Sequence, residues 1–411
     1  MKFRRALALS LIIALLLIWI LVWKDPPQSG NYSPSTAFID ATRNFHKPST
    51  LPRAFVPGIL KSSPKLHNYY INTTVSLQEV NVYIKEFHQE QRVPKNDRQK
   101  IVLCVVCCGR ERINETQTAL KSAILFSSSP LQLIVFTELQ YFNAFINMRT
   151  AWPAETQARV TLSLQEVHYP EFVKENDWRN LFRECASLRL FLPTLLPEVE
   201  SVLYIDTDVL FVSPVEAVWH NFLMMNKTQL AAVTPEHQDS SAGWYNRFAK
   251  HPYYGKLGIN SGVMLMQLAR MRTFGWEDHI VPLRQQYKQH IRWGDQDLIN
   301  ILFHFHPELV YVLDCSYNFR PDHCMYGSVC KPASKTGAKL IHASRRAAFT
   351  DKFPPFQEVY NTIAMFRLGE DTLVDGLYER TKSRLRALPA GRCSQDTSVY
   401  TRQMQLYSAL N

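Results

Sequence analysis

From about residue 101 onward, short apolar runs alternate with segments of helical spacing. The apolar runs predict strands at 101–108, 131–137, 160–164, 202–205, 230–233, 263–268 and 340–342. The helical spacing predicts helices at 114–126, 183–195, 214–222 and 298–305. Because strands and helices alternate, we expect a single Rossmann-like α/β domain with a mixed, mostly parallel sheet and helices on both of its faces.

The N-terminal segment has a different pattern. An uncharged apolar stretch at 6–23 follows Lys2, Arg4 and Arg5, and it is long enough to cross a bilayer. The positive charges before it favour a cytoplasmic N-terminus and a lumenal bulk, as in a single-pass type II membrane protein. A cleaved signal peptide is the alternative, but the stretch ends in Trp23 and a lysine rather than in the small residues of a cleavage site.

These patterns predict the organisation of the whole chain. Residues 24–99 are rich in Pro, Ser, Asn and Lys and lack sustained periodicity, which is typical of a stem. We therefore expect a cytoplasmic tail at 1–5, a membrane anchor at 6–23, a lumenal stem at 24–99, a catalytic domain at 100–385 and a C-terminal tail at 386–411.

The net charge and the cysteine content indicate which ligands and which cellular compartment suit the chain. The net charge of +10 is spread along the chain without a long basic run. This distribution suits a polyphosphate ligand or an acidic membrane, or simply a solvated surface, and we expect no nucleic-acid partner.

All eight cysteines lie beyond residue 100 with spacings that are poor for zinc, so we expect disulfides or buried thiols. Cys315, Cys324 and Cys330 could close one loop, with their pairing left open. Asparagine-linked glycosylation motifs, which favour a secretory compartment, begin at Asn31, Asn72, Asn114 and Asn226.

Two aspartates directly follow the predicted strand at 202–205. In extended backbone, residues two apart point to the same side, so Asp206 and Asp208 can converge on one point. Divalent cations accept carboxylate oxygens as ligands. The pattern therefore indicates a metal site, although Asp-x-Asp also occurs in turns, where Asp bonds its own backbone.

Other polar positions lie at predicted strand or helix ends. Ligands of open α/β sheets bind beyond the carboxyl ends of the strands, where Cys108-Gly109 and Asp206-Thr207-Asp208 lie. The Gly-x-Gly-x-x-Gly and P-loop patterns are absent from the sequence, which argues against a dinucleotide-binding motif. Gly294-Asp295-Gln296-Asp297 opens the helix at 298–305, with Asp295 as the expected N-cap, and His342 ends the last strand.

In their order along the chain, these motifs resemble glycosyltransferase family 8, the glycogenin-like retaining transferases. The resemblance covers roughly 101–355 and includes Asn260-Ser261-Gly262-Val263. The stretches GWYNRFAKHPYYGK, NSGVMLM, WGDQDL and YNFRPDHCMYGSVC are similar to the glucoside xylosyltransferase branch. The resemblance implies a GT-A fold, a Golgi or endoplasmic reticulum membrane location, and transfer of xylose from UDP-xylose in α linkage. The implied acceptor is the O-linked glucose of EGF-like repeats, such as those of Notch.

The resemblance also implies roles for the matching residues. Asp206, Asp208 and His342 would bind Mn²⁺, a metal for which an imidazole beside two carboxylates is acceptable. The implied donor-binding residues are Cys108, Gly109, Arg189, Asp206, Thr207, Asp208, Asn260, Ser261 and Gly262.

The implied catalytic residues are Asp295 and Gln296. Asp295 would bind hydroxyls of the transferred sugar, while Gln296 would lie on the face opposite the leaving group. Because glutamine is a poor nucleophile, Gln296 favours front-face attack over a covalent intermediate.

One position departs from the family pattern. The wider family commonly has a lysine six residues after the histidine, which contacts the diphosphate, whereas this chain has Ala348 there. Arg345, Arg346 or Lys352 could supply the positive charge, and Lys352 best resembles the xylosyltransferase branch.

The acceptor side and the overall activity leave alternatives open. Trp244, Tyr245, Tyr253 and Tyr254 could contact the acceptor sugar or belong to the core. A sister transferase with another UDP-sugar or a xyloside acceptor, and a catalytically silent lumenal binding protein with the same fold, are the alternatives to a glucoside xylosyltransferase.

Overall fold

The computed structural model describes residues 100–410. The predicted membrane anchor and stem, together with Asn31 and Asn72, lie outside the described residues. Among the helices within 100–410, none combines the length and the apolar composition needed to cross a bilayer.

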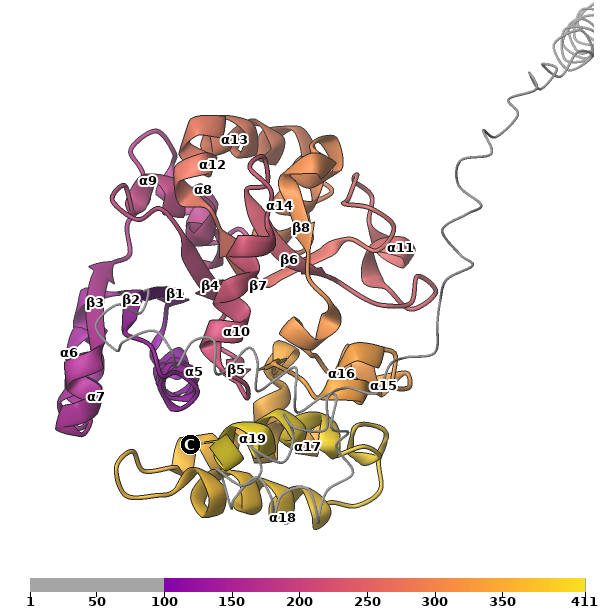
Figure 1. Cartoon of the computed structure of the whole chain (residues 1–411). Coiled ribbons are helices and arrows are strands. Elements are labelled where there is room, and N and C mark those ends of the chain that lie inside the picture. Colours follow the sequence, from indigo (N-terminus) through magenta and orange to yellow (C-terminus); the bar gives the residue numbers. More distant parts are fainter. Residues whose placement is uncertain (1–99, 411) are drawn as a thin grey trace, which may run out of the picture. The chain divides into compact units, whose positions relative to one another are not determined.

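A seven-stranded mixed sheet forms the centre of the domain (Figure 1). Its strand order is β3-β2-β1-β4-β7-β6-β8. The first four strands of this order are parallel, β7 is antiparallel to both of its neighbours, and β6 and β8 are parallel. The prediction of a mixed, mostly parallel sheet is confirmed. The strands are β1 Ile101–Cys107, β2 Leu131–Thr137, β3 Val160–Glu166, β4 Val202–Ile205, β6 Ala231–Pro235, β7 Ile259–Met266 and β8 Val310–Val312.

Both faces of the sheet are covered, because alternate strand residues enter two different apolar clusters. In β1, Leu103 and Val105 face one cluster, whereas Cys104 and Val106 face the other. In Figure 1, helices α12 to α14 lie above the sheet and α17 to α19 lie below it. The helices are α5 Ile113–Leu125, α6 Phe142–Thr150, α7 Ala154–Arg159, α8 Glu175–Arg179, α9 Leu192–Leu195, α10 Val215–Trp219, α11 Trp244–Phe248, α12 Leu268–Phe274, α13 Trp276–Tyr287, α14 Asp295–Phe305, α15 Asp322–Met325, α16 Lys331–Thr336, α17 Pro354–Met365, α18 Arg380–Arg386 and α19 Ser398–Leu410.

A second, two-stranded antiparallel sheet lies next to the main one. It pairs β5 Val209–Phe211 with β9 Leu340–His342, and its register sets Val209 opposite His342. This small sheet brings the C-terminal part of the domain back to the end of β4.

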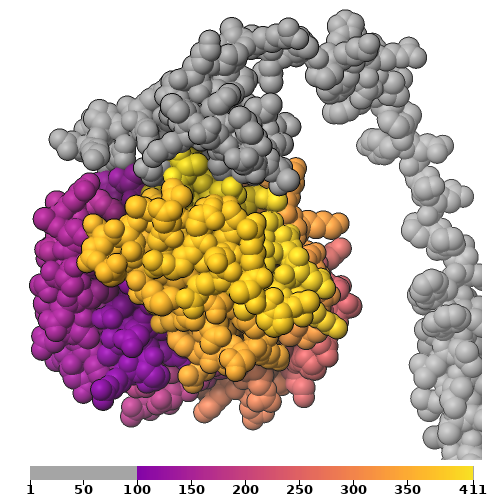
Figure 2. All heavy atoms as spheres, turned by 90° about the horizontal axis from the view of Figure 1, so that it is seen from below, coloured from indigo at the N-terminus to yellow at the C-terminus, as the bar shows by residue number. Residues whose placement is uncertain are grey.

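The C-terminal segment is part of the domain, so the expectation of a tail at 386–411 is wrong. Helix α19 buries Tyr400 and Met404, and the Tyr407 ring lies 5.1 Å from that of Phe126. A disulfide joins Cys324 to Cys393. Figure 2 shows the C-terminal helices, in yellow, forming a broad surface beside the purple N-terminal part of the domain.

Three details of the predicted elements need correction. The helix expected at 183–195 begins later, as a 3₁₀ helix at Ala186–Phe191 (η4) followed by α9, because Cys185 adopts a left-handed conformation with φ 59°. Gly294, not Asp295, is the N-cap residue of α14. The strand expected at 263–268 begins earlier, at Ile259, and ends at Met266.

The expectation of disulfides and buried thiols is confirmed. Besides the Cys324–Cys393 bond, disulfides join Cys108 to Cys185 and Cys315 to Cys330. Cys104 and Cys107 are free and buried, and burial raises the pKa of the Cys107 thiol to about 11. A buried thiol of this kind is unreactive at neutral pH.

Candidate functional site

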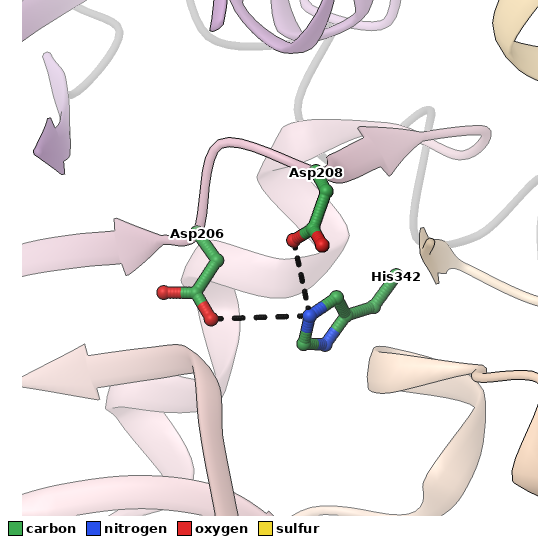
Figure 3. Close-up of side chains that lie close together, drawn as sticks. All are labelled: Asp206, Asp208 and His342. Carbon is green, nitrogen blue, oxygen red and sulfur yellow. Dashed lines mark ion pairs between the residues drawn. The ribbon is translucent and has the colours of Figure 1, made fainter. Parts of the chain in front are cut away.

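Three potential metal ligands meet where β4, β5 and β9 end. Ligand atoms of Asp206, Asp208 and His342 all lie within 4.8 Å of one another. The His342 Nε2 atom is 3.1 Å from Asp208 Oδ1 and 3.8 Å from Asp206 Oδ2, so the imidazole faces both carboxylates (Figure 3). Two carboxylates and one imidazole suit Mn²⁺ better than Mg²⁺.

The backbone explains why residues so far apart in sequence converge. Asp206 follows β4 and its N–H donates to Gly262 O at 2.8 Å, which fixes it beside β7. Asp208 precedes β5, and its carbonyl oxygen accepts from Ala343 N at 2.8 Å, directly after β9. Pairing of β5 with β9 therefore carries His342 to the two aspartates.

Gly262 is required by the metal-ligand side chains. A Cβ atom at this position would lie 2.3 Å from His342 Cε1 and 2.9 Å from Asp206 Oδ2. No other residue type would fit without moving a ligand. Gly262 thus leaves room for His342 and Asp206, whereas the expectation was a contact with the donor.

A chain of amide hydrogen bonds links the metal ligands to Gln296. His342 Nδ1 donates to Asn318 Oδ1 at 2.8 Å, which leaves Nε2 free to face a cation. Asn318 Nδ2 donates to Asn260 Oδ1 at 2.8 Å, and Asn260 Nδ2 donates to Gln296 Oε1 at 3.0 Å. The orientation of Gln296 is therefore coupled to that of His342. Sequence reasoning missed Asn318, although it lies in the family-like stretch beginning at Tyr317.

Arg189 bridges the two acidic parts of the site. Its Nη2 lies 2.8 Å from Asp206 Oδ1, and its Nε lies 2.6 Å from Asp295 Oδ2. Burial lowers the pKa of Arg189, but the two carboxylates outweigh it and raise that pKa. Burial also raises the pKa of Asp295 to about 6, against the opposing effect of Arg189. Arg189 thus holds two otherwise repelling carboxylates in place.

A second acidic network supports Asp208. Glu115 of α5 is buried, accepts a hydrogen bond from the Thr207 hydroxyl and forms an ion pair with Arg112 at 3.0 Å. Burial and the nearby Asp208 raise the pKa of Glu115. Burial would raise the pKa of Asp208, but His342 and Arg112 lower it. Neither Glu115 nor Arg112 carried a recognisable sequence signal, because an acid and a base on a helix are ordinary surface residues.

The metal ligands, Arg189, Asp295 and Gln296 line a cavity of about 590 Å³, a size that suits a small ligand. Among the predicted residues, the lining includes Cys108, Arg189, Asp206, Thr207, Asp208, Trp244, Asn260, Ser261, Asp295, Gln296 and His342. Further lining residues include Glu111, Arg112, Phe182, Arg183, Glu236, His237, Arg247, Phe248, Trp293, Arg320, Asp322 and Tyr326.

Several predicted site residues lie elsewhere. Gly109, which precedes the 3₁₀ turn after β1, donates its N–H to Glu138 and is not part of the lining. Lys352 is exposed over the ring of Phe353 and also lies outside the lining, whereas Arg345 and Arg346 are part of it. The favoured choice of Lys352 thus receives no support from its position.

The tyrosines of the expected acceptor group also lie outside the lining. Tyr245 is 1% exposed, and its hydroxyl bonds Asp297 at 2.9 Å and Asn300 at 2.9 Å. This corrects the expected acceptor contact at Tyr245, because a buried ring cannot present its face to a sugar. The Tyr253 ring contacts that of Tyr245, and Tyr254 packs against the second apolar cluster.

Two predicted glycosylation positions fall on the described surface. Asn114, in the first turn of α5, and Asn226, between α10 and β6, are both exposed. Their exposure is compatible with attachment of a glycan, which stays a prediction.

Comparisons with known proteins identify the family of the chain. Residues 67–343 match the family described as glycosyl transferase family 8. Glucoside xylosyltransferase 1 of Danio rerio is 42% identical over 328 residues, which cover 77% of this chain and 80% of that protein. Glucoside xylosyltransferase 1 of Homo sapiens is 45% identical over 289 residues, which cover 67% of this chain and 64% of that protein. Among solved structures, mouse xyloside xylosyltransferase 1 in its apo form aligns with a TM-score of 0.46 and 18% identity, covering 61% of this chain and 99% of that one.

Proposed function

The chain belongs to glycosyltransferase family 8, and we propose that it transfers xylose from UDP-xylose in α linkage to O-linked glucose on EGF-like repeats, with Mn²⁺ as its metal. The convergence of Asp206, Asp208 and His342 in the lining of one cavity is the observation that carries the proposal. The identity to glucoside xylosyltransferases over most of the chain supports the choice of sugar and acceptor.

The three ligands fit the proposed metal. Their donor atoms form one compact set, Gly262 leaves room behind them, and Asn318 fixes the tautomer of His342. A bound Mn²⁺ would neutralise negative charge on the departing diphosphate. Arg189 would hold Asp206 in its ligating position and Asp295 beside the sugar.

The arrangement of Gln296 supports front-face attack. Its Oε1 atom accepts hydrogen bonds from Asn260 Nδ2 at 3.0 Å and Ser261 N at 3.1 Å, so a weak nucleophile is further engaged by two donors. Asp295 is bound in an ion pair with Arg189. Neither group is free to form a glycosyl intermediate. The acceptor hydroxyl oxygen would therefore bond the anomeric carbon as the bond to UDP breaks, and its proton would pass to the departing phosphate.

We assign the missing diphosphate cation to Arg346. This residue lines the cavity four positions after His342 and has no acidic partner among residues 100–410. Arg345, its neighbour, is already paired with Asp322. Both arginines have positive φ, 59° and 63°, a conformation that costs energy in residues other than glycine and recurs at functional sites.

The proposal extends to the cellular location. The apolar stretch at 6–23 and the glycosylation motifs support a type II protein of the Golgi or endoplasmic reticulum membrane, with residues 100–410 in the lumen. Detection of glycan on Asn114 or Asn226 of the cell-made protein would support it, whereas a purely cytosolic location would contradict it.

A donor screen tests the proposed reaction. The purified enzyme is incubated with Mn²⁺, with UDP-xylose, UDP-glucose or UDP-galactose, and with an EGF repeat that either carries O-linked glucose or lacks it. We expect transfer of xylose to the glucosylated repeat alone. Use of another sugar would indicate a sister transferase. Absence of any transfer, together with thermal stabilisation by Mn²⁺ and UDP, would indicate a silent binding protein.

A further inference from the structure

Four aromatic rings from three separate segments meet along one side of the cavity. We call Phe182, Trp244, Phe248 and Trp293 the aromatic wall. Ring centroids are 5.3 Å apart for Phe182 and Trp293, 5.5 Å for Trp244 and Trp293, and 6.3 Å for Trp244 and Phe248. All four residues line the cavity, so the wall is one continuous surface of that space.

A buried carboxylate fixes two of the three segments relative to each other. Asp297 has no exposed surface, and its Oδ2 accepts from Trp293 N at 2.7 Å and from Arg292 N at 2.6 Å. Its Oδ1 accepts from Tyr245 OH at 2.9 Å, next to Trp244 in α11. Asp297 therefore ties the loop before α14 to α11, and the two tryptophans meet edge to face as a result.

Glycine fixes the third segment. Gly294 has φ 58°, and a Cβ atom there would lie 2.5 Å from Phe182 Cβ. This close approach lets Phe182 reach Trp293. The wall is thus held by specific contacts of all three segments rather than by general apolar packing.

Two rings of the aromatic wall are exposed to solvent, which is unfavourable for large apolar groups. A binding role would explain this exposure. Phe182 is 42% exposed and Phe248 is 52% exposed, whereas large rings normally enter a core. The wall also shares the cavity with the proposed catalytic pair, since Trp293, Asp295 and Gln296 all line it and a backbone hydrogen bond from Gln296 N to Trp293 O, 3.2 Å, joins the two segments. A ligand resting on these rings would therefore lie beside Gln296.

The composition of the cavity indicates what that ligand is. Beyond the rings, the lining includes Glu236, His237 and Asp322, which suit hydroxyl groups and do not suit a purely apolar molecule. A sugar ring has both properties, because it presents C–H groups on its face and hydroxyls at its edge.

We propose that the aromatic wall binds the acceptor, a hexose ring attached to a protein surface, while the three metal ligands bind the donor diphosphate. This inference rests on the proposed function. Its main competitor is stacking of the donor's uracil on the same rings.

Direct binding measurements distinguish acceptor binding from stacking of the uracil. Binding of a glucosylated EGF repeat to the full-length enzyme is measured calorimetrically with Mn²⁺ and UDP present, for wild type, Trp293→Ala and Phe248→Ala. Loss of an aromatic anchor typically costs enough binding energy for about a 10-fold weaker affinity. We expect that weakening for the repeat in both variants, with unchanged affinity for UDP.

A control variant outside the cavity and a second variant of the wall distinguish loss of acceptor binding from misfolding. Phe305→Ala removes an equally exposed ring, 53% exposed, that does not line the cavity, and it should bind the repeat normally. Phe248→Ala guards against misfolding of Trp293→Ala, since its ring is half exposed. Weaker UDP binding with unchanged repeat binding would overturn the inference in favour of the uracil. Failure of wild type to bind the repeat would also overturn it. Binding without transfer would leave the wall intact and refute the proposed reaction.

Discussion

Two groups of cavity-lining residues differ in composition: the metal ligands with their partners, which we call the metal-ligand end, and the aromatic wall. At the metal-ligand end, charged and amide groups are buried or half-buried and nearly every one contacts another: Arg189 bridges two carboxylates, and Asn318 and Asn260 connect His342 to Gln296. At the aromatic wall, rings contact one another and leave much of their surface exposed. The first group is arranged around fixed charges, whereas the second presents exposed rings, two of which also contact the guanidinium groups of Arg183 and Arg247.

The difference has a structural origin. The residues of the metal-ligand end lie at the ends of strands, where sheet hydrogen bonds fix the backbone. The residues of the aromatic wall lie on loops and on the short helix α11. Contacts of Asp297 and Gly294 hold these segments in place. We therefore expect mutations at the metal-ligand end to affect metal and donor binding steeply, and to leave binding of the glucosylated repeat unchanged.

Removal of Arg189 is expected to have the largest effect. Arg189→Ala leaves Asp206 and the buried Asp295 without their shared cation, and breaking a buried ion pair costs about 3–5 kcal/mol. Urea unfolding should show a loss of that order, together with loss of transfer. Arg272→Ala, which removes an arginine bonded only to backbone carbonyls, is the comparison. Equal stability of wild type and Arg189→Ala would contradict the bridging role.

Removal of one metal ligand should abolish activity while keeping the fold. Asp208→Asn keeps the size of the side chain but lacks the charge, and we expect transfer to fall by at least about 1000-fold. Thermal stabilisation by Mn²⁺ and UDP should disappear as well. The exposed Asp351→Asn is the matched control. Metal-dependent stabilisation that survived in Asp208→Asn would exclude this residue as a ligand.

Loss of the partner of His342 should weaken metal binding more moderately. Asn318→Ala frees the imidazole to rotate, and supporting residues of this kind are worth about 10–100-fold in metal affinity. Mn²⁺ titration followed by thermal shift measures the change, with Asn221→Ala, outside the cavity lining, as the control. Because Asn318 also orients Asn260, we expect a lower rate at saturating Mn²⁺, and a fully restored rate would show that the amide chain does not reach Gln296.

The smallest effect is expected at the diphosphate cation. Arg346→Ala should raise the KM for UDP-xylose by about 10-fold, the value of one charge-assisted hydrogen bond. Lys352→Ala should leave it unchanged, since Lys352 does not line the cavity. The opposite result would restore Lys352 as the donor contact.

The sequence predicted the metal-ligand end much better than the aromatic wall. Asp206 and Asp208 are two apart in an extended stretch, so their convergence follows from local geometry. Gly262 was expected to bind the donor, but the structure shows that a side chain there would meet His342 and Asp206. Asn318 and Glu115 were missed, because amide and acid partners far apart in sequence carry no local pattern.

The aromatic residues show where prediction from the sequence failed. Trp244 and Tyr245 are adjacent in sequence and were expected to act alike, yet Trp244 lines the cavity while Tyr245 is buried on Asp297. Consecutive residues of a helix point in different directions, and α11 is too short to show a period. Phe182 gave no signal, and Trp293 belongs to the family-like stretch WGDQDL without an indication that it would meet Phe182, since only the close approach at Gly294 brings them together.

The sequence by itself determined the α/β class, the strands that carry the aspartates and the family to which the chain belongs, because apolar periodicity and ordered motifs are local properties. The tertiary structure alone decided the pairing of β5 with β9 that delivers His342, the burial of α19 in the core, the three disulfide partners and the meeting of the metal ligands and the aromatic wall in one cavity. These features depend on contacts between residues distant in the chain, and such contacts form only when the sheet and its covering helices pack together.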